Sequence, residues 1–142
     1  DHPGILFVAG FIGTPQINFI GTILRKDEKG YYMEVDNARF YILPERLADK
    51  DLEGHLDHAV VLGVRPEDVN EADREDLTYI EALVEVRELL GAEVYLYINY
   101  KGNKITARVP NSTTAQMDDR IKVTFDPAKL HVFDKDTQET LL

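Results

Sequence analysis

The 142-residue chain contains no cysteine. This absence excludes disulfide bonds and thiolate chemistry, and it fits a cytosolic protein because disulfides persist mainly in oxidising compartments. Basic residues are also scarce, with 16 Lys and Arg against 26 Asp and Glu and a formal net charge of −10. Binding to a phosphate backbone needs a basic face, so the acidic balance argues against a nucleic-acid partner and against an anionic membrane surface.

The sequence also lacks the motifs that bind nucleotide phosphates. Neither Gly-x-x-x-x-Gly-Lys-Ser/Thr nor Gly-x-Gly-x-x-Gly is present. The only serine, Ser112, lies among Asn and Thr residues that are typical of a loop, not of a nucleophile elbow. Glu85 and Glu88 are candidate acid–base carboxylates, but nothing marks either as buried against an apolar wall. We therefore predict no catalytic residue.

Two segments were considered as metal sites. Residues 49–54 resemble the start of a calcium loop with Gly54 at the sixth position, but the twelfth position, where a bidentate Glu belongs, is Val60. His55 and His58 have the spacing of two ligands on one helical face, and the sequence places no third ligand beside them. We predict no metal site and no cofactor in this chain.

An uncharged apolar stretch opens the chain, since no charged residue occurs from position 3 to position 24. A membrane span needs about 20 residues of continuous helix, and Pro15 would break it. A secretory signal needs a basic first region and a cleavage site, and both are missing. The third interpretation is a short buried helix that ends at Gly13 and passes into a strand, because the residue before Pro15 is driven to extended geometry.

The rest of the sequence is typical of short strands joined by turns. Two hairpins are predicted, one over residues 19–35 with Gly30 ending its loop and one over residues 93–109 with Gly102-Asn103 at its centre. Further strands are predicted at residues 39–43, 58–65, 120–125 and 130–133. Residues 67–76 are predicted to be a solvated loop, and residues 134–142 a tail. This spacing indicates a mainly β protein, either a barrel or a sandwich.

Residues 78–90 are ambiguous by pattern alone. They are rich in good helix formers, yet Ile80, Ala82, Val84 and Val86 alternate with the period of a strand. Six tyrosines could form a platform for stacking bases, but without a basic groove their packing in the core and the hairpins is the better interpretation.

Four segments carry a family resemblance. The first, FVAGFIGTPQINF at residues 7–19, is similar to the junction where a last helix of an ABC importer ATPase enters a C-terminal regulatory domain. The others are LGVRPEDV at 62–69, VEVRELLGAE at 84–93 and FDPAKLHVFD at 125–134. In this order and spacing they resemble the ATP-binding subunits of maltose-type and multi-sugar ABC importers over essentially the whole chain.

The resemblance implies a transport-associated OB-like (TOBE) β-barrel, preceded over residues 1–15 by a short terminal helix and the junction from a nucleotide-binding domain. Residues 16–142 would be the regulatory domain, and residues 78–90 a strand. The ATP and Mg²⁺ sites would belong to the preceding domain, so this chain itself is not expected to be an enzyme. Expected partners are a second copy, the nucleotide-binding domain, the membrane subunits and a regulatory protein. The expected location is the inner face of the cell membrane, reached through the transporter complex without membrane insertion.

The chain also departs from that family. Asp118 stands where relatives usually have Gly, and Gln138 stands where a Gly is common. Both departures concern local turn geometry. The alternative function that remains open is a small-ligand or oxyanion sensor, because related domains in molybdate systems bind oxyanions.

The sequence yields interface candidates instead of catalytic ones. They comprise residues at the domain junction, a charged turn after a predicted strand, and two positions in the third matched segment. These candidates are Phe11, Pro15, Asn18, Phe19, Arg65, Pro66, Glu67, Glu88 and Gly91.

Overall fold

The computed structural model describes residues 17–48, 50–75 and 77–142. These residues form ten strands and four short 3-10 segments, with no α-helix among them. The predicted mainly β fold is confirmed. The helix and junction predicted over residues 1–15 lie outside the described residues.

The first sheet has the strand order β10-β4-β1-β2-β3, and all its neighbours are antiparallel. Its strands are β1 (Asn18–Asp27), β2 (Gly30–Val35), β3 (Ala38–Tyr41), β4 (Ala59–Val64) and β10 (His131–Asp134). The 3-10 segments η1 (Pro44–Leu47) and η2 (Glu53–His55) lie between β3 and β4. The predicted first hairpin is confirmed, because β1 pairs with β2 across the turn that Gly30 closes.

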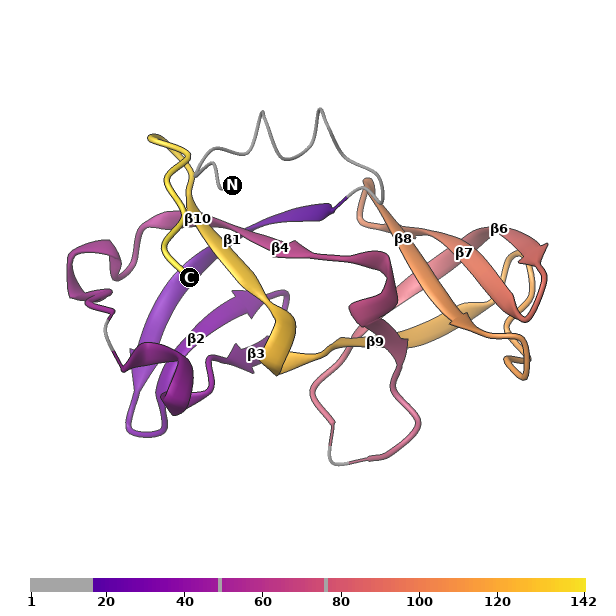
Figure 1. Ribbon diagram of the computed structural model, residues 1–142, viewed down its shortest axis with the longest axis horizontal. Helices are drawn as coiled ribbons and strands as arrows, with labels where there is room; N and C mark the ends of the chain where they lie inside the picture. Colours follow the sequence, from indigo (N-terminus) through magenta and orange to yellow (C-terminus); the bar gives the residue numbers. More distant parts are fainter. Residues whose placement is uncertain (1–16, 49, 76) are drawn as a thin grey trace.

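The second sheet has the order β5-β9-β6-β7-β8 and is also antiparallel. Its strands are β5 (Val69–Glu71), β6 (Ile80–Leu90), β7 (Glu93–Tyr100), β8 (Asn103–Pro110) and β9 (Arg120–Phe125). The chain crosses between the sheets at η3 (Pro66–Asp68) and again at η4 (Pro127–Lys129). The two sheets lie side by side along the long axis of the molecule (Figure 1).

One cluster of buried side chains runs through both sheets. Alternation within each strand supplies it, as in β7, where Val94, Leu96 and Ile98 are almost fully buried. Between the sheets, the rings of Phe40 on β3 and Phe125 on β9 have centroids 5.0 Å apart. Burial of such aromatic pairs stabilises the contact between the two halves.

The structure resolves the ambiguity at residues 78–90 as strand β6. The prediction of a plain loop at 67–76 was wrong, because β5 lies within it and Val69 is fully buried. The prediction of a tail at 134–142 was also wrong. The amide of Leu142 donates to the carbonyl of Val132, and Leu142 is buried.

Two departures from the family pattern lie at positions with a left-handed backbone. Asp118 has a φ of 73° and Gln138 a φ of 64°, both in the left-handed region that glycine adopts without strain.

The second hairpin is centred one residue earlier than predicted. Tyr100 pairs with Asn103, so Lys101 and Gly102, with φ of 48° and 89°, form the two-residue turn.

Candidate interaction surface

A β-bulge in β6 decides which side chains face outward. Val84 lies opposite Ile98, but the next pair is Val86 opposite Tyr97, so Glu85 is an extra residue in β6. Side chains alternate along a strand, so one extra residue reverses the faces beyond it. Val84 is fully buried, whereas Val86 is 48% exposed. The bulge therefore moves Val86 to the outer face, although the period-two pattern grouped it with Val84.

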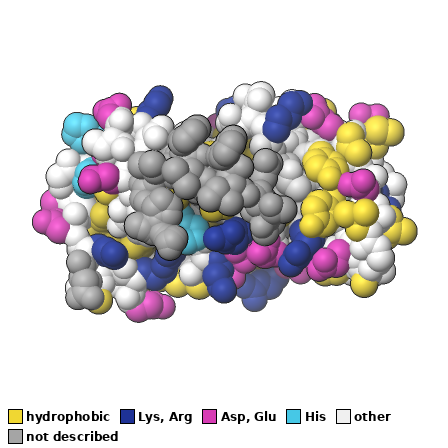
Figure 2. Space-filling model, turned by 45° about the horizontal axis from the view of Figure 1, so that its top comes forward, with side chains coloured by type: hydrophobic (Ala, Val, Ile, Leu, Met, Phe, Trp, Pro, Cys, Tyr) yellow, Lys and Arg dark blue, Asp and Glu magenta, His cyan; other side chains and the backbone are white. Residues whose placement is uncertain are grey.

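Beyond the bulge, β6 and β7 present a partly apolar outer face. Its members, here called the β6–β7 face, share one side of the sheet by register: Val86, Glu88, Leu90, Tyr95 and Tyr97. Val86 and Leu90 are each 48% exposed. Hydrophobic side chains gather at the end of the molecule that holds this sheet, with charged side chains among them (Figure 2). Exposed apolar groups beside tyrosines are typical of surfaces that bind other proteins.

Polar contacts hold this face in one arrangement. The Tyr97 hydroxyl donates to Glu88 Oε1 at 2.8 Å, and this hydrogen bond raises the pKa of Tyr97. On the neighbouring strand β8, Arg108 Nε lies 3.4 Å from Glu93 Oε1. Acidic and basic groups therefore border the apolar side chains, which allows pairing with a complementary surface.

Two of the predicted interface residues belong to this region. Glu88 lies within the β6–β7 face, and Gly91 lies in the adjoining β6–β7 turn with a φ of 65°. Both are exposed. The sequence named these two positions as interface candidates, and that role stays a prediction. It did not name Leu90, and it did not name Val86 because the bulge that exposes Val86 leaves no mark in the hydrophobic pattern.

Asn18 joins the two sheets through its side-chain amide. Its Nδ2 donates to the carbonyl of Thr106 at 2.8 Å, and its Oδ1 accepts from the Thr106 amide at 2.8 Å. Thr106 lies on β8, an edge strand of the second sheet. The buried Asn18 thus satisfies both backbone groups of one edge residue, as a neighbouring strand would.

Phe19 follows on β1 and packs against the last strand. Its ring lies edge-to-face with that of Phe133 on β10, with centroids 6.1 Å apart and an interplanar angle of 77°. In this structure Phe19 therefore makes a contact within the first sheet. Phe11 and Pro15, the other junction candidates, lie outside the described residues.

Arg65, Pro66 and Glu67 form the crossing from β4 into η3. Pro66 is buried at the first position of η3, where its fixed φ suits a helical turn. Glu67 Oε1 is buried and has no hydrogen-bond partner in the described part of the chain, and the same holds for Arg108 Nε. The pKa of Arg108 is raised, mainly by the hydrogen bond between Arg108 and Tyr95 and to a smaller extent by the charge of Glu67. This turn therefore lies against β8, and its role as an intermolecular contact stays a prediction.

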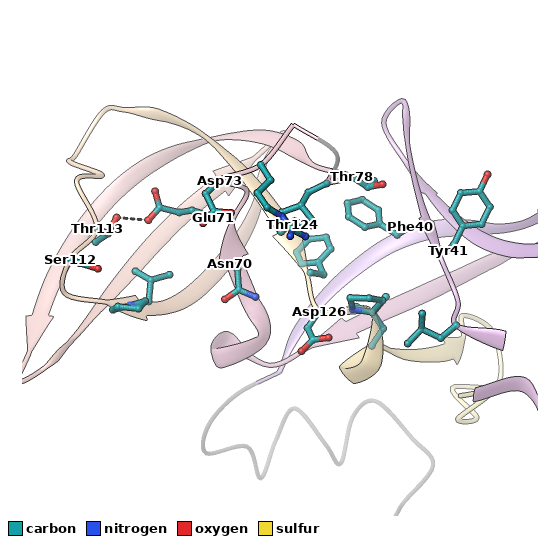
Figure 3. A pocket seen from close by; sticks show the side chains of 18 of the residues that line it. Phe40, Tyr41, Asn70, Glu71, Asp73, Thr78, Ser112, Thr113, Thr124 and Asp126 are labelled. Atoms are coloured by element: carbon teal, nitrogen blue, oxygen red, sulfur yellow. Dashed lines mark hydrogen bonds between the residues drawn. The ribbon is translucent and has the colours of Figure 1, made fainter. Parts of the chain in front are cut away.

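A cleft of about 1030 Å³ lies where the two sheets meet. Phe40 and Tyr41 from β3 border one side, and Ser112 and Thr113 from the loop after β8 border the other (Figure 3). Asn70 lies between them on β5 (Figure 3). No single segment contributes the whole lining, and the sequence contains no signal for it.

Among residues 17–48, 50–75 and 77–142, no group of three or more His, Cys, Asp or Glu side chains is arranged to hold a metal ion. In the same part of the chain, no helix has the length and apolar character needed to cross a membrane.

Family models match almost the whole described chain. Residues 13–69 match the MalK OB fold domain, and residues 62–133 match the TOBE domain. The chain belongs to the TOBE domain family. The two matches overlap at the end of β4 and η3, where the chain leaves the first sheet for the second.

Curated relatives are ATP-binding proteins of ABC transporters. The putative uncharacterized ABC transporter ATP-binding protein YcjV of Escherichia coli K12 is 34% identical over 97% of this chain. The multiple sugar-binding transport ATP-binding protein MsmK of Streptococcus mutans is 30% identical over 99%, and the trehalose/maltose import ATP-binding protein MalK of Thermococcus litoralis 29% over 99%. The chain spans 37–38% of the length of these relatives. The predicted resemblance to sugar-importer ATP-binding subunits is confirmed.

A solved structure supports the fold independently. The cytoplasmic molybdate-binding protein ModG, with molybdate bound, superimposes with a TM-score of 0.61 at 11% identity. The match covers 84% of this chain and 96% of that protein. At this identity the likeness concerns the fold alone.

Proposed function

We propose that this TOBE domain is the regulatory and dimerisation part of the ATP-binding subunit of a sugar-type ABC importer. It would keep two subunits associated while their nucleotide-binding domains separate and close, and it would offer a surface to a regulatory protein. The β6–β7 face carries this proposal, because it exposes Val86 and Leu90 beside two tyrosines. The relatives that match over the whole chain support the transporter context.

A second copy of the chain is the occupant to which the proposal commits. In a two-fold dimer the same patch faces itself, so a charged side chain in the patch needs an opposite charge in the same patch as its partner. Glu88 and Glu93 lie near Arg108 on this side of the sheet, which allows each acid to meet a base of the other copy. The apolar side chains between them would be covered.

Light scattering tests the oligomeric state directly. The unmodified chain should have the molar mass of a dimer at micromolar or higher concentration. Leu90→Lys should give a monomer, because it places a charge in the covered apolar area. Ala59→Lys is the matched control, since Ala59 is exposed at the start of β4 in the first sheet, whereas the face belongs to the second sheet. A monomeric unmodified chain, or an equal loss of dimer in both variants, would contradict the proposal.

ATP turnover tests the non-enzymatic part of the proposal. The ATP and Mg²⁺ sites are assigned to the preceding domain, so the isolated chain should neither bind nor hydrolyse ATP. Calorimetry should detect no heat of ATP binding. Measurable hydrolysis by the purified chain would contradict the assignment. In the whole protein, the domain would lie on the cytoplasmic side of the membrane and contact the transporter only through its partners.

A further inference from the structure

We infer that the cleft between the two sheets is a binding site for a neutral, hydroxyl-rich small molecule of the saccharide or polyol class. The inference concerns the cleft alone and does not require the β6–β7 face to form a dimer. It rests on the chemistry of the cleft walls, the apolar floor and the sign of the local charge.

The walls present polar side chains that have no partner. Asn70, Asp73, Ser112 and Thr124 line the cleft, and within residues 17–48, 50–75 and 77–142 their side chains make no hydrogen bond. The first three are exposed and Thr124 is half-buried. Together they supply an amide and two hydroxyls, which both donate and accept hydrogen bonds, and a carboxylate, which accepts them. Ligand hydroxyl groups need this mixture, because each of them also donates and accepts.

The floor of the cleft is apolar. Tyr41, Leu43 and Leu77 line the cleft with half-buried side chains that keep apolar surface open to a ligand. Phe40 and Phe125 also line it, but each is buried to at least 95% and leaves little surface exposed. The C–H faces of a saccharide ring are apolar and pack on such surfaces while the ring hydroxyls reach the walls. An apolar floor with a few convergent polar groups is the usual composition of a small-molecule site.

The negative charge of the cleft favours a neutral ligand over an oxyanion. Three carboxylates line it, those of Glu71, Asp73 and Asp126, against the single guanidinium of Arg74. The net negative charge repels molybdate, sulfate and phosphate, and a neutral molecule avoids this cost. The fold likeness to a molybdate-binding protein therefore does not extend to the ligand in this cleft.

One wall is held in place before a ligand arrives. The Thr113 hydroxyl donates to the Glu71 carboxylate, which ties the loop after β8 to β5 (Figure 3). At the other end, Asp126 accepts from the Ala128 amide at 3.0 Å. Preformed walls reduce the ordering cost of binding.

Titration of the isotope-labelled chain tests the inference. Maltose, trehalose, glucose and sorbitol are added from micromolar to millimolar concentration, while amide chemical shifts are followed by NMR. At least one of the four should shift the amides of Asn70, Ser112 and Thr124 with a saturating curve. Molybdate and sulfate, in separate titrations, should leave these amides unchanged.

Two variants locate the site. Asn70→Ala and Asp73→Ala should each weaken binding about fivefold, the effect of losing one hydrogen bond. Asp136→Ala is the matched control, because Asp136 is exposed in the tail turn and is not part of the cleft lining. Absence of shifts with all four probes, shifts confined to other residues, or saturable binding of an oxyanion to these amides would each overturn the inference. A dimer defect in Leu90→Lys would leave this titration unaffected.

Discussion

Several non-glycine residues in this chain have a left-handed backbone conformation, which residues with a Cβ atom disfavour. Gln138 has a φ of 64° in the turn after β10, and Asp118 a φ of 73° in the turn before β9. The left-handed region costs a residue with a Cβ about 1–2 kcal/mol, less for Asp, whose side chain bonds locally. The family resemblance indicated that Asp118 and Gln138 replace glycines. It could not show that the backbone at both positions keeps a positive φ, as it would with glycine.

Gln138→Gly should stabilise the chain by about 0.5 kcal/mol. Glycine removes the strain of the left-handed backbone, but it also loses more conformational entropy on folding than glutamine does, which offsets part of the gain. Urea unfolding monitored by circular dichroism measures the change. Lys135→Gly is the control, because Lys135 is not among the residues with positive φ, and it should destabilise. A loss of stability in Gln138→Gly would contradict the assigned turn.

His131 makes stability depend on pH. Burial lowers its pKa, and the charges of Arg46 and Arg65 lower it further, while the charge of Asp68 acts in the opposite direction. The unfolded chain then binds this proton more readily than the folded chain does. Stability from this group is therefore present above about pH 6.5, the ordinary His pKa, and decreases as the pH falls below it.

The free energy of unfolding should consequently fall between pH 8 and pH 5, and His131→Gln should make that fall smaller. Urea unfolding at several pH values, kept above the range in which carboxylates titrate, measures both curves. His58→Gln is a control, because His58 is exposed beside η2. Identical pH dependence in the unmodified chain and His131→Gln would contradict this account.

At the scale of elements, strand alternation and turn residues made most of the fold predictable. The two hairpins, strand β4 and strand β9 follow from local pattern, because their hydrophobic residues alternate or cluster between turn signals. Strand β5 and the folded-back end at Leu142 were not predictable. Strand β5 depends on pairing with β9, which is distant in the sequence, and the chain end folds back onto the preceding strand β10 without a strand pattern of its own.

The candidate surface was predictable only in part, for the same physical reason. Glu88 and Gly91 were identified through the family resemblance. The exposure of Val86 depends on a bulge in the pairing of β6 with β7. The cleft was not predictable, because its lining comes from β3, β5, β8, β9, η4 and the loops beside them.

Gly63 on β4 lies close to the ring of Phe133 on the paired strand β10. A Cβ built there would lie 2.9 Å from Phe133 Cε2, closer than atoms pack without a shift. Gly63→Ala should destabilise the chain by about 1–3 kcal/mol. Phe133→Leu in the same chain should recover part of this loss, and a double-mutant cycle of urea unfolding measures the coupling. Additive effects of the two substitutions would contradict the proposed steric contact.

Asn18→Ala should loosen the attachment of β1 to β8. It removes two hydrogen bonds of 2.8 Å and leaves both backbone groups of Thr106 without their partner, at a cost of about 2 kcal/mol. Thermal and urea unfolding measure the loss, and faster hydrogen exchange of the Thr106 amide locates it. Asn37→Ala in the exposed β2–β3 turn is the control. Unchanged exchange at Thr106 would contradict this role for Asn18.

At the scale of the whole molecule, two surfaces with different chemistry lie on the second sheet and at its junction with the first. The β6–β7 face is partly apolar and points outward, whereas the cleft is polar-walled and lies between the sheets. In the proposed function the first surface holds a second copy, and in the separate inference about the cleft the second takes a neutral ligand. A ligand bound where the sheets meet contacts both halves of the domain, so it has a physical route to influence how they pack.

The absence of cysteine allows a direct test of the dimer. Glu88→Cys places one thiol in the β6–β7 face, and Glu28→Cys places one in the exposed β1–β2 turn as the matched control. Each purified chain is oxidised under identical conditions, and the disulfide-linked dimer is quantified on a non-reducing gel. The account predicts rapid and nearly complete cross-linking through position 88 and slow, concentration-dependent cross-linking through position 28. Equal rates at the two positions, or faster cross-linking at position 28, would contradict it.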